Sequence, residues 1–203
     1  MPYDYQLTHQ RILESAMKHF TEVGFRDASI RNICRDAGVT NGAFYVHFKS
    51  KEELFAALVD DCIKGFTQAY EGYAEYEVKS KEDLVRMFES TYPSIEALLH
   101  YVYQHSAQFM LVLRCSQGSV YEGFVDQMVH EEAGNTMIYL EKCRQFMDHP
   151  ENISERIAEI FADMAIRHAF DAFVRGVTEE DNIRETKLAS NFCIAGYRSI
   201  LGF

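Results

Sequence analysis

The sequence predicts an all-α protein of about nine helices, and three observations lead to this fold class. Only three prolines and 11 glycines occur in 203 residues, which disfavours a sandwich of many short strands. Apolar residues recur three and four positions apart in nearly every segment, as in amphipathic helices, and no segment alternates like a convincing strand. With 47% hydrophobic residues the chain can bury a sizeable core, which we expect to be divided between residues 1–50 and 51–203.

The first fifty residues carry start and stop signals for three helices. The first is expected over Thr8–Val23, with Gly24 as its C-terminal stop. Ser29 is a good N-cap for a second, short helix that ends at Gly38. Thr40 caps a third helix directly after it. Three short helices in this order predict a compact N-terminal head.

A capping box and a similar start signal open the two helices that follow. Residues 50–53 read Ser-Lys-Glu-Glu and residues 80–83 read Ser-Lys-Glu-Asp, each with a hydroxyl at the cap and a carboxylate three positions later. The second of these helices should bend near Pro93, whose ring removes a backbone hydrogen bond. Asn152 with Glu155 resembles a further capping box after the break at His149-Pro150. The remaining helices are expected at 104–113, 120–147, 152–177 and 182–201.

Several classes of protein are disfavoured by what the sequence lacks. The five cysteines are scattered without a CxxC pair, which argues against a disulfide framework or a zinc ribbon and for a reducing cytoplasm. No secretory signal and no run of 18 apolar residues is visible, so we expect no membrane association. There is no GxSxG elbow, Gly-rich phosphate loop or HExxH. We therefore expect neither an enzyme nor a protein with a bound metal or cofactor.

The net charge of −11 is unevenly distributed along the chain. Residues 1–51 hold 7 Lys and Arg against 5 Asp and Glu, whereas residues 52–203 hold 13 against 26. The head therefore carries +2 and the remainder −13. A weakly basic head on an acidic body fits a molecule whose one end meets phosphate, although acidic surfaces also serve solubility alone.

The segment 29–51, SIRNICRDAGVTNGAFYVHFKSK, predicts a helix-turn-helix whose second helix enters the DNA major groove. The groove is about 12 Å wide, so the residues that face the bases must be short or polar, as Thr40, Asn41 and Gly42 are. Hydroxyl, imidazole and ammonium groups further along can reach phosphate oxygens. The candidate DNA-binding residues are Ser29, Thr40, Asn41, Gly42, Ala43, Tyr45, His47 and Lys51.

These residues resemble the DNA-binding domain of the TetR family of bacterial regulators (TetR/AcrR type). The matching stretches are Gly24-Phe25, Ser29-Ile30, Ala37-Gly38-Val39, Thr40 to Phe48 and Lys49 to Leu54, in the family's order and spacing. The resemblance implies a DNA-binding head followed by a variable domain that binds an effector and dimerises. The rest of the chain matches the family only in length, helicity and acidity.

Small residues form a stripe along the helix expected at 152–177, at alternating spacings of four and three. Such a stripe lets another helix approach closely, and a four-helix dimer interface, which the resemblance also implies, would use it together with the last helix. Packing of the same helices within one chain is the alternative. The expected dimer-interface residues are Ala158, Phe161, Ala162, Ala165, Ala169, Ala172, Phe173, Gly176, Ala189, Phe192, Cys193 and Gly196.

Residues 84–147 are rich in Tyr, Phe, Met and His, which are plausible walls for an apolar pocket with a few polar groups. The same residues at helical spacing can equally be plain core. The expected effector-binding residues are Tyr92, Leu99, Tyr103, His105, Phe109, Met110, Arg114, Met128, Tyr139 and His168.

We therefore expect a cytoplasmic, homodimeric transcription repressor that binds an inverted-repeat operator in double-stranded DNA and that a small, mostly apolar effector releases. One alternative is an architectural or chromosome-organising DNA-binding protein with no small-molecule ligand. Another is a helical enzyme or carrier in which the helix-turn-helix is vestigial. The sequence identifies neither the effector nor the operator, nor whether the effector weakens or strengthens DNA binding.

Overall fold

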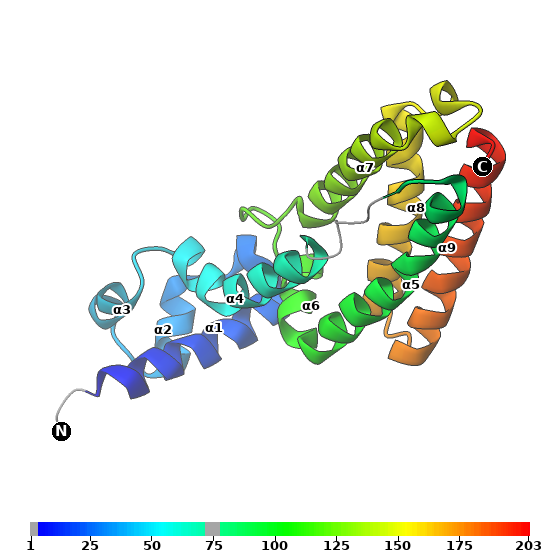
Figure 1. Cartoon of the computed structure of the whole chain (residues 1–203). Helices are drawn as coiled ribbons and strands as arrows, with labels where there is room; N and C mark the ends of the chain where they lie inside the picture. Colours follow the sequence, from blue (N-terminus) through cyan, green and yellow to red (C-terminus); the bar gives the residue numbers. More distant parts are fainter. Residues whose placement is uncertain (1–3, 72–77) are drawn as a thin grey trace. The chain divides into compact units, whose positions relative to one another are not determined.

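The computed structural model describes residues 4–71 and 78–203, and the side chains among them except those of residue 71 and residues 87–94. These residues form nine α-helices and two short 3-10 turns, with no strand among them (Figure 1). The expected all-α fold class is confirmed. The chain divides into two compact units, residues 1–65 with 105–123 and residues 66–104 with 124–203.

The first unit is built from α1 (Tyr5–Asp27), α2 (Ile30–Ala37), α3 (Asn41–His47), the start of α4 (Lys51–Glu71) and α6 (Ser106–Arg114). Large apolar side chains without exposed surface form its core: Ile12, Phe20, Ile33, Phe44, Leu54, Phe55 and Phe109. The ring of Phe55 lies edge-on to Phe20, with centroids 5.1 Å apart. The Ser15 hydroxyl donates to the Ile33 carbonyl at 2.9 Å and so ties α1 to α2. The predicted head is thus extended by α6, which comes much later in the chain.

The second unit contains the last residues of α4 together with α5 (Lys81–Gln104), α7 (Phe124–Lys142), α8 (Glu155–Val174) and α9 (Glu179–Leu201). Helix α8 packs against α7 and α9, and α9 packs against α5 (Figure 1). Two 3-10 turns, Arg144–Phe146 and Pro150–Asn152, join α7 to α8. The second turn lies at the break expected from His149-Pro150.

A buried polar network holds α5, α8 and α9 of the second unit together. The fully buried Asn182 amide donates to the Tyr103 hydroxyl at 3.1 Å and to the Ala169 carbonyl at 2.9 Å. The Thr186 hydroxyl donates to the Asn182 side-chain oxygen at 3.1 Å. The Tyr103 hydroxyl in turn donates to the Val177 carbonyl at 2.8 Å. Every buried polar atom named here has a partner, which is the condition for burying such groups without a large penalty.

Two helix starts differ from the prediction. Helix α8 is capped by Ser154, whose hydroxyl accepts from the Ile157 N–H, and not by Asn152. The Asn152 amide instead donates to the Ile200 carbonyl at 3.1 Å. Asn152 therefore bonds to the end of α9 and not to the start of α8. Helix α9 begins at Glu179, earlier than expected, because the Thr178 hydroxyl caps it by accepting from the Asp181 N–H.

The helix stop expected at Gly24 and the bend expected at Pro93 compare with the structure as follows. Gly24 has φ +77° and interrupts helical geometry as expected, but a further helical turn carries α1 on to Asp27. Helix α5 is continuous through Pro93, where a bend was expected. No helix among the residues that the structure describes is long and apolar enough to cross a membrane.

Candidate nucleic-acid interface

The turn between α2 and α3 is fixed by Gly38 and Thr40. Gly38 adopts the left-handed conformation, φ 65° and ψ 37°, and its N–H donates to the Arg35 carbonyl at 3.1 Å. The Val39 N–H donates to the Cys34 carbonyl at 2.9 Å, which satisfies another carbonyl at the end of α2. The Thr40 hydroxyl then accepts from the Ala43 N–H at 3.1 Å and starts α3. The sequence predicted both caps correctly.

Helix α3 presents one exposed face to solvent. Asn41, Gly42, Tyr45 and Val46 are exposed, with Tyr45 at 58% and Val46 at 63%, whereas Phe44 and His47 are buried. At about 100° per residue, the four exposed positions span roughly 140° of the helix surface. The Tyr45 ring stands edge-on to Phe44, with centroids 5.2 Å apart. The sequence reasoning missed Val46, although an apolar residue between two polar positions of a recognition helix was a usable signal.

The predicted phosphate contact from His47 is not supported, because this side chain packs inside the head. Its ring lies 4.1 Å from the ring of Tyr5 and 5.5 Å from that of His9, measured between centroids. Burial, followed by the nearby His9, lowers the pKa of His47. The neutral, buried imidazole anchors the end of α3 against the start of α1.

Lys51 also has a different role from the predicted one. Its ammonium donates to the carbonyls of Phe25, Arg26 and Ala28 at 2.7, 3.1 and 3.1 Å, and lies 4.5 Å from the centroid of the Phe25 ring. All three ammonium hydrogens are therefore used on the last turn of α1. This arrangement argues against a phosphate site at Lys51, because the same donors cannot also face an anion.

Ser29 occupies the cap position of α2, but its hydroxyl makes no capping hydrogen bond. Its carbonyl accepts from the Asn32 and Ile33 N–H groups, and its side chain is half-buried. The hydroxyl of Ser29 stays available to a phosphate as a hydrogen-bond donor.

Thr40 and Asn41 are exposed and Ala43 is half-buried, so these three lie at or beside the accessible face of α3.

Two cations that the sequence reasoning missed are better placed than Lys51 to meet phosphate. Arg31, in the first turn of α2, is exposed and makes no ion pair or side-chain hydrogen bond with any residue that the structure describes. Lys49 follows α3 after one residue and is also exposed. Among the described residues its backbone N–H donates to the Glu53 carboxylate, and its ammonium makes no ion pair or hydrogen bond. By contrast, Arg35 pairs with Asp36 at 2.9 Å. The feature that identifies such a cation is the absence of an ion-pair partner, which only a structure reveals.

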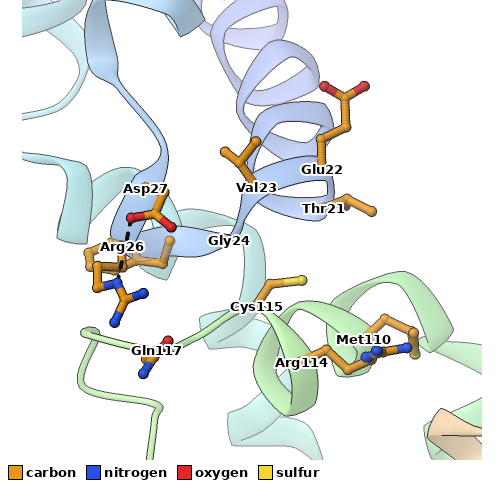
Figure 2. A pocket seen from close by; sticks show the side chains of 11 residues that line it. Thr21, Glu22, Val23, Gly24, Arg26, Asp27, Met110, Arg114, Cys115 and Gln117 are labelled. Atoms are coloured by element: carbon orange, nitrogen blue, oxygen red, sulfur yellow. Dashed lines mark ion pairs between the residues drawn. The ribbon is translucent and has the colours of Figure 1, made fainter.

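A cleft of about 460 Å³ lies within the first unit between the end of α1 and α6 (Figure 2). Two residues predicted to bind an effector, Met110 and Arg114, line it, together with Cys115 and the last turn of α1. The Phe25 N–H donates to the Cys115 carbonyl at 2.7 Å, which joins the two helix ends. These two predicted effector residues are therefore brought together, but beside the end of α1 in the first unit.

The effector site expected at the other eight residues stays a prediction, and the described side chains among them have different surroundings. Leu99, Phe109 and Met128 are buried core residues, and Tyr103 is engaged in the network around Asn182. His168 is exposed and pairs with Glu185 at 3.7 Å, so it does not line an interior. His105 is half-buried at the start of α6, Tyr139 is half-buried with the Lys142 ammonium 5.5 Å from its ring, and the side chain of Tyr92 lies outside the described residues.

A polar pair inside the second unit was not predicted. The Tyr70 hydroxyl donates to the half-buried Glu132 carboxylate, and burial, followed by the charge of Glu132, raises the pKa of Tyr70 above its ordinary value. Burial and then Glu132 raise the pKa of Tyr197 in the same way. No Lys, Arg or His of the described residues forms an ion pair with Glu132. The pair is a candidate for orienting a polar group of an effector.

The predicted stripe of small residues on α8 is divided between two environments. Ala158, Ala162, Ala172, Phe173 and Cys193 are buried within the chain, so for them the packing alternative describes the structure. Phe161, Ala165, Ala169, Ala189 and Gly196 are half-buried, and Gly176 is exposed. The small residues thus serve mainly to bring α7, α8 and α9 together, which spacing alone could not distinguish from an interface between chains.

An exposed apolar strip runs along α8 and α9. It consists of Ile160 and Met164 on α8 and Leu188 and Phe192 on α9, exposed by 49, 39, 62 and 69%. The two helices meet at His168–Glu185 on one side of the strip and at Phe161–Gly196 on the other. Met164 lies one helical turn before His168 and Leu188 about one turn after Glu185, so helical spacing places both exposed side chains beside the His168–Glu185 contact. Phe192 was predicted as an interface residue, and the other three were not.

Comparisons with known proteins agree with the helix-turn-helix geometry. Residues 12–58 match the family described as "Bacterial regulatory proteins, tetR family". The chain is 41% identical over 54 residues to the uncharacterized HTH-type transcriptional regulator YdgC of Bacillus subtilis, covering 27% of this chain and 28% of that one. It is 35% identical over 86 residues to the HTH-type transcriptional regulator UidR of Escherichia coli, covering 39% and 44%. The chain thus spans less than half the length of these two curated relatives.

Two solved structures resemble the whole chain in fold. A TetR-like transcriptional regulator from Rhodococcus sp. RHA1 has a TM-score of 0.58 at 22% identity, over 97% of each chain. A TetR-family regulator from Syntrophomonas wolfei has a TM-score of 0.62 at 19% identity, over 95% of this chain and 97% of that one. The two curated relatives and the Rhodococcus protein are each described as transcriptional regulators. Residues 12–58, which include the helix-turn-helix, are thus similar to the family of bacterial regulatory proteins of the TetR type.

Proposed function

We propose that the chain is a dimeric transcription repressor of the cytoplasm that binds an inverted-repeat operator and that a small, mostly apolar effector releases from DNA. The observation that carries this proposal is the exposed face of α3, formed by Asn41, Gly42, Tyr45 and Val46 on a turn fixed by Gly38 and Thr40. Groups of this size fit a major groove that admits one helix. The match of residues 12–58 to the family of bacterial regulatory proteins supports it.

In the proposed complex, base contacts and phosphate contacts come from different residues. Asn41 and Val46 face the base edges, and Gly42 lets the backbone of α3 approach closely. Tyr45, Arg31 and Lys49 carry exposed donors that can reach phosphate oxygens on either side of the groove. Ser29 and Thr40 supply further hydroxyls near the helix starts. Phosphate contacts position the protein, and base contacts select the sequence.

Dimerisation is proposed through the α8/α9 strip of Ile160, Met164, Leu188 and Phe192. Side chains this apolar gain about 25 cal/mol for each Å² that a second copy removes from water. The half-buried Ala165, Ala189 and Gly196 on the same two helices are small enough to allow close approach of another helix. A twofold dimer presents two recognition helices, and an inverted repeat with half-sites about 34–36 Å apart matches that symmetry.

Release by an effector requires a link between the DNA-binding head and the rest of the chain. Helix α6 belongs to the first unit, although α5 before it and α7 after it belong to the second. At the end of α6, the Cys115 carbonyl accepts a hydrogen bond from the Phe25 N–H. Phe25 directly follows Gly24, the residue at which the helical geometry of α1 is interrupted. An effector that shifts α6 would therefore act on the end of α1. Differential binding to the two states, typically about 1–3 kcal/mol, sets the size of the response.

The experiment that tests the proposal is selection of bound duplexes from a random DNA library at physiological salt, with sedimentation equilibrium of the same preparation. We expect a palindrome with regularly spaced half-sites and a dimer in solution. Small molecules are then screened for loss of binding to the selected duplex. A dimer with no enriched sequence would contradict operator binding. Specific binding that no compound of a broad apolar library alters would favour the architectural alternative.

A further inference from the structure

We infer that the base pairs read by α3 are A·T pairs, recognised by the Asn41 amide and the Val46 side chain. This inference rests on the proposed function and names the class of sequence in the operator half-site. It depends on which chemical groups the exposed face of α3 carries and which it lacks. Both can be compared directly with the groups that each base pair shows in the major groove.

The exposed face of α3 contains no cation. None of the seven residues Asn41–His47 is Lys or Arg. Arg and Lys are the side chains that pair with the two acceptors of guanine, and an acidic side chain, also absent, is the one that accepts from cytosine. The face therefore lacks the usual partners of a G·C pair. The exposed Arg31 belongs to α2 and lies outside this face.

Asn41 offers the group that matches adenine. Its side chain is exposed and forms no hydrogen bond with any residue in the described part of the chain. A free amide carries a donor and an acceptor side by side, which is the pattern complementary to N7 and N6 of adenine. Because Gly42 follows it without a side chain, nothing on that position keeps the amide away from the base edge.

Val46 offers the group that matches thymine. Its side chain is 63% exposed, whereas Phe44 on the same helix is fully buried. The C5-methyl of thymine is the apolar feature of the major-groove edge, so it is the natural contact for an exposed valine. Asn41 and Val46 are five residues apart, about 7.5 Å along the helix axis. At about 3.4 Å per base pair, they reach bases two or three steps apart.

The test uses the full-length protein, the selected duplex and two base analogues. Affinities are measured by fluorescence anisotropy for wild type, Asn41→Ala and Val46→Ala, on duplexes in which single thymines are replaced by deoxyuridine or single adenines by 7-deazaadenine. Deoxyuridine lacks only the methyl group, and 7-deazaadenine lacks only the N7 acceptor. Val120→Ala is the matched control, because Val120 is a valine exposed by 86% outside α3.

We expect deoxyuridine at one position to lower the DNA affinity of wild type about fourfold, as the loss of one buried methyl group would. The same replacement should not lower the affinity of Val46→Ala any further. One 7-deazaadenine position within three base pairs of it should weaken wild-type binding by roughly fivefold or more and have no further effect on Asn41→Ala. The Val120→Ala protein should behave as wild type at every position.

Three outcomes are distinguishable. Loss of each analogue's effect in the matching variant supports the inference. Two results would overturn the inference and leave the proposed function standing. The first is a selected palindrome with G·C pairs at the positions whose base preference changes in Asn41→Ala and Val46→Ala. The second is equal sensitivity of variants and wild type to the base analogues. Selection of no palindrome at all overturns the proposed function, and this inference with it.

Discussion

The exposed face of α3 and the apolar strip of α8 and α9 are both uncovered surfaces of one chain, but their chemistry differs. The first is short and mixed, with an amide, a glycine, a phenol and one valine. The second has four large apolar side chains, of which Phe192 is 69% exposed. A mixed face suits a groove lined by phosphates and water, whereas an apolar strip suits a second protein surface. The difference supports the proposal that the first surface meets DNA and the second meets another copy of the chain.

The largest effect should come from placing a charge in the strip. We expect Phe192→Asp to raise the dimer dissociation constant by roughly 100-fold or more, because burying an unpaired carboxylate costs about 3 kcal/mol or more. Operator binding should weaken with it, since two linked heads gain from effective concentration. Sedimentation equilibrium measures the first change and anisotropy the second. Ile138→Asp, on an exposed isoleucine of α7, is the control and should leave a dimer. If Phe192→Asp stays dimeric, the strip is not the interface.

Lys51 and Lys49 provide a matched pair within the DNA-binding head. Lys51→Met removes a cation from three carbonyls and should lower stability by about 2 kcal/mol, which for a chain of this length is a Tm decrease of about 4–8 °C. Lys49→Met should leave the Tm unchanged, but weaken DNA binding and reduce its salt dependence by about one unit of slope. Thermal melts and salt titrations of both variants separate the two roles. The reverse pattern would restore Lys51 as the phosphate ligand.

Gly38 and Gly42 form a second pair, with a smaller effect on stability. Gly38 has φ +65°, and a Cβ there would lie 2.3 Å from the end of the flexible Arg11 side chain, so Gly38→Ala should cost about 1–2 kcal/mol. Gly42 is helical and a Cβ would meet only ordinary contacts, so Gly42→Ala should melt no lower than wild type. Its methyl should nevertheless weaken operator binding by keeping α3 further from the bases. Equal Tm values for the two variants would contradict the role of Gly38.

The head was predictable because its signals are local. Gly38, Thr40 and the Ser50–Glu53 box act within a few residues, and each cap was found where expected. The roles of Lys51 and His47 were not predictable in this way, because their partners Phe25 and Tyr5 lie far away in the sequence. On α8 the spacing of the alanines identified a close helix contact correctly. It could not tell α7 and α9 of the same chain from a partner, since the packing requirement is the same.

The smallest expected effect is on the pH dependence of the Tm, to which His47 of the first unit contributes. Because burial lowers the pKa of His47, the unfolded chain, whose His titrates near 6.5, binds more protons than the folded one below that pH. The contribution of His47 to stability is therefore present above about pH 6.5 and decreases as the pH falls through that range. We expect the Tm of wild type to decrease more between pH 7.5 and 5.5 than that of His47→Phe, which keeps a ring against Tyr5. His130→Phe, at an exposed position of α7, should retain the wild-type dependence. Since His47 lies in the first unit, wild type and His47→Phe should show the same dimer at each of the two pH values. The same pH dependence in wild type and His47→Phe would show that this imidazole is not held neutral by burial.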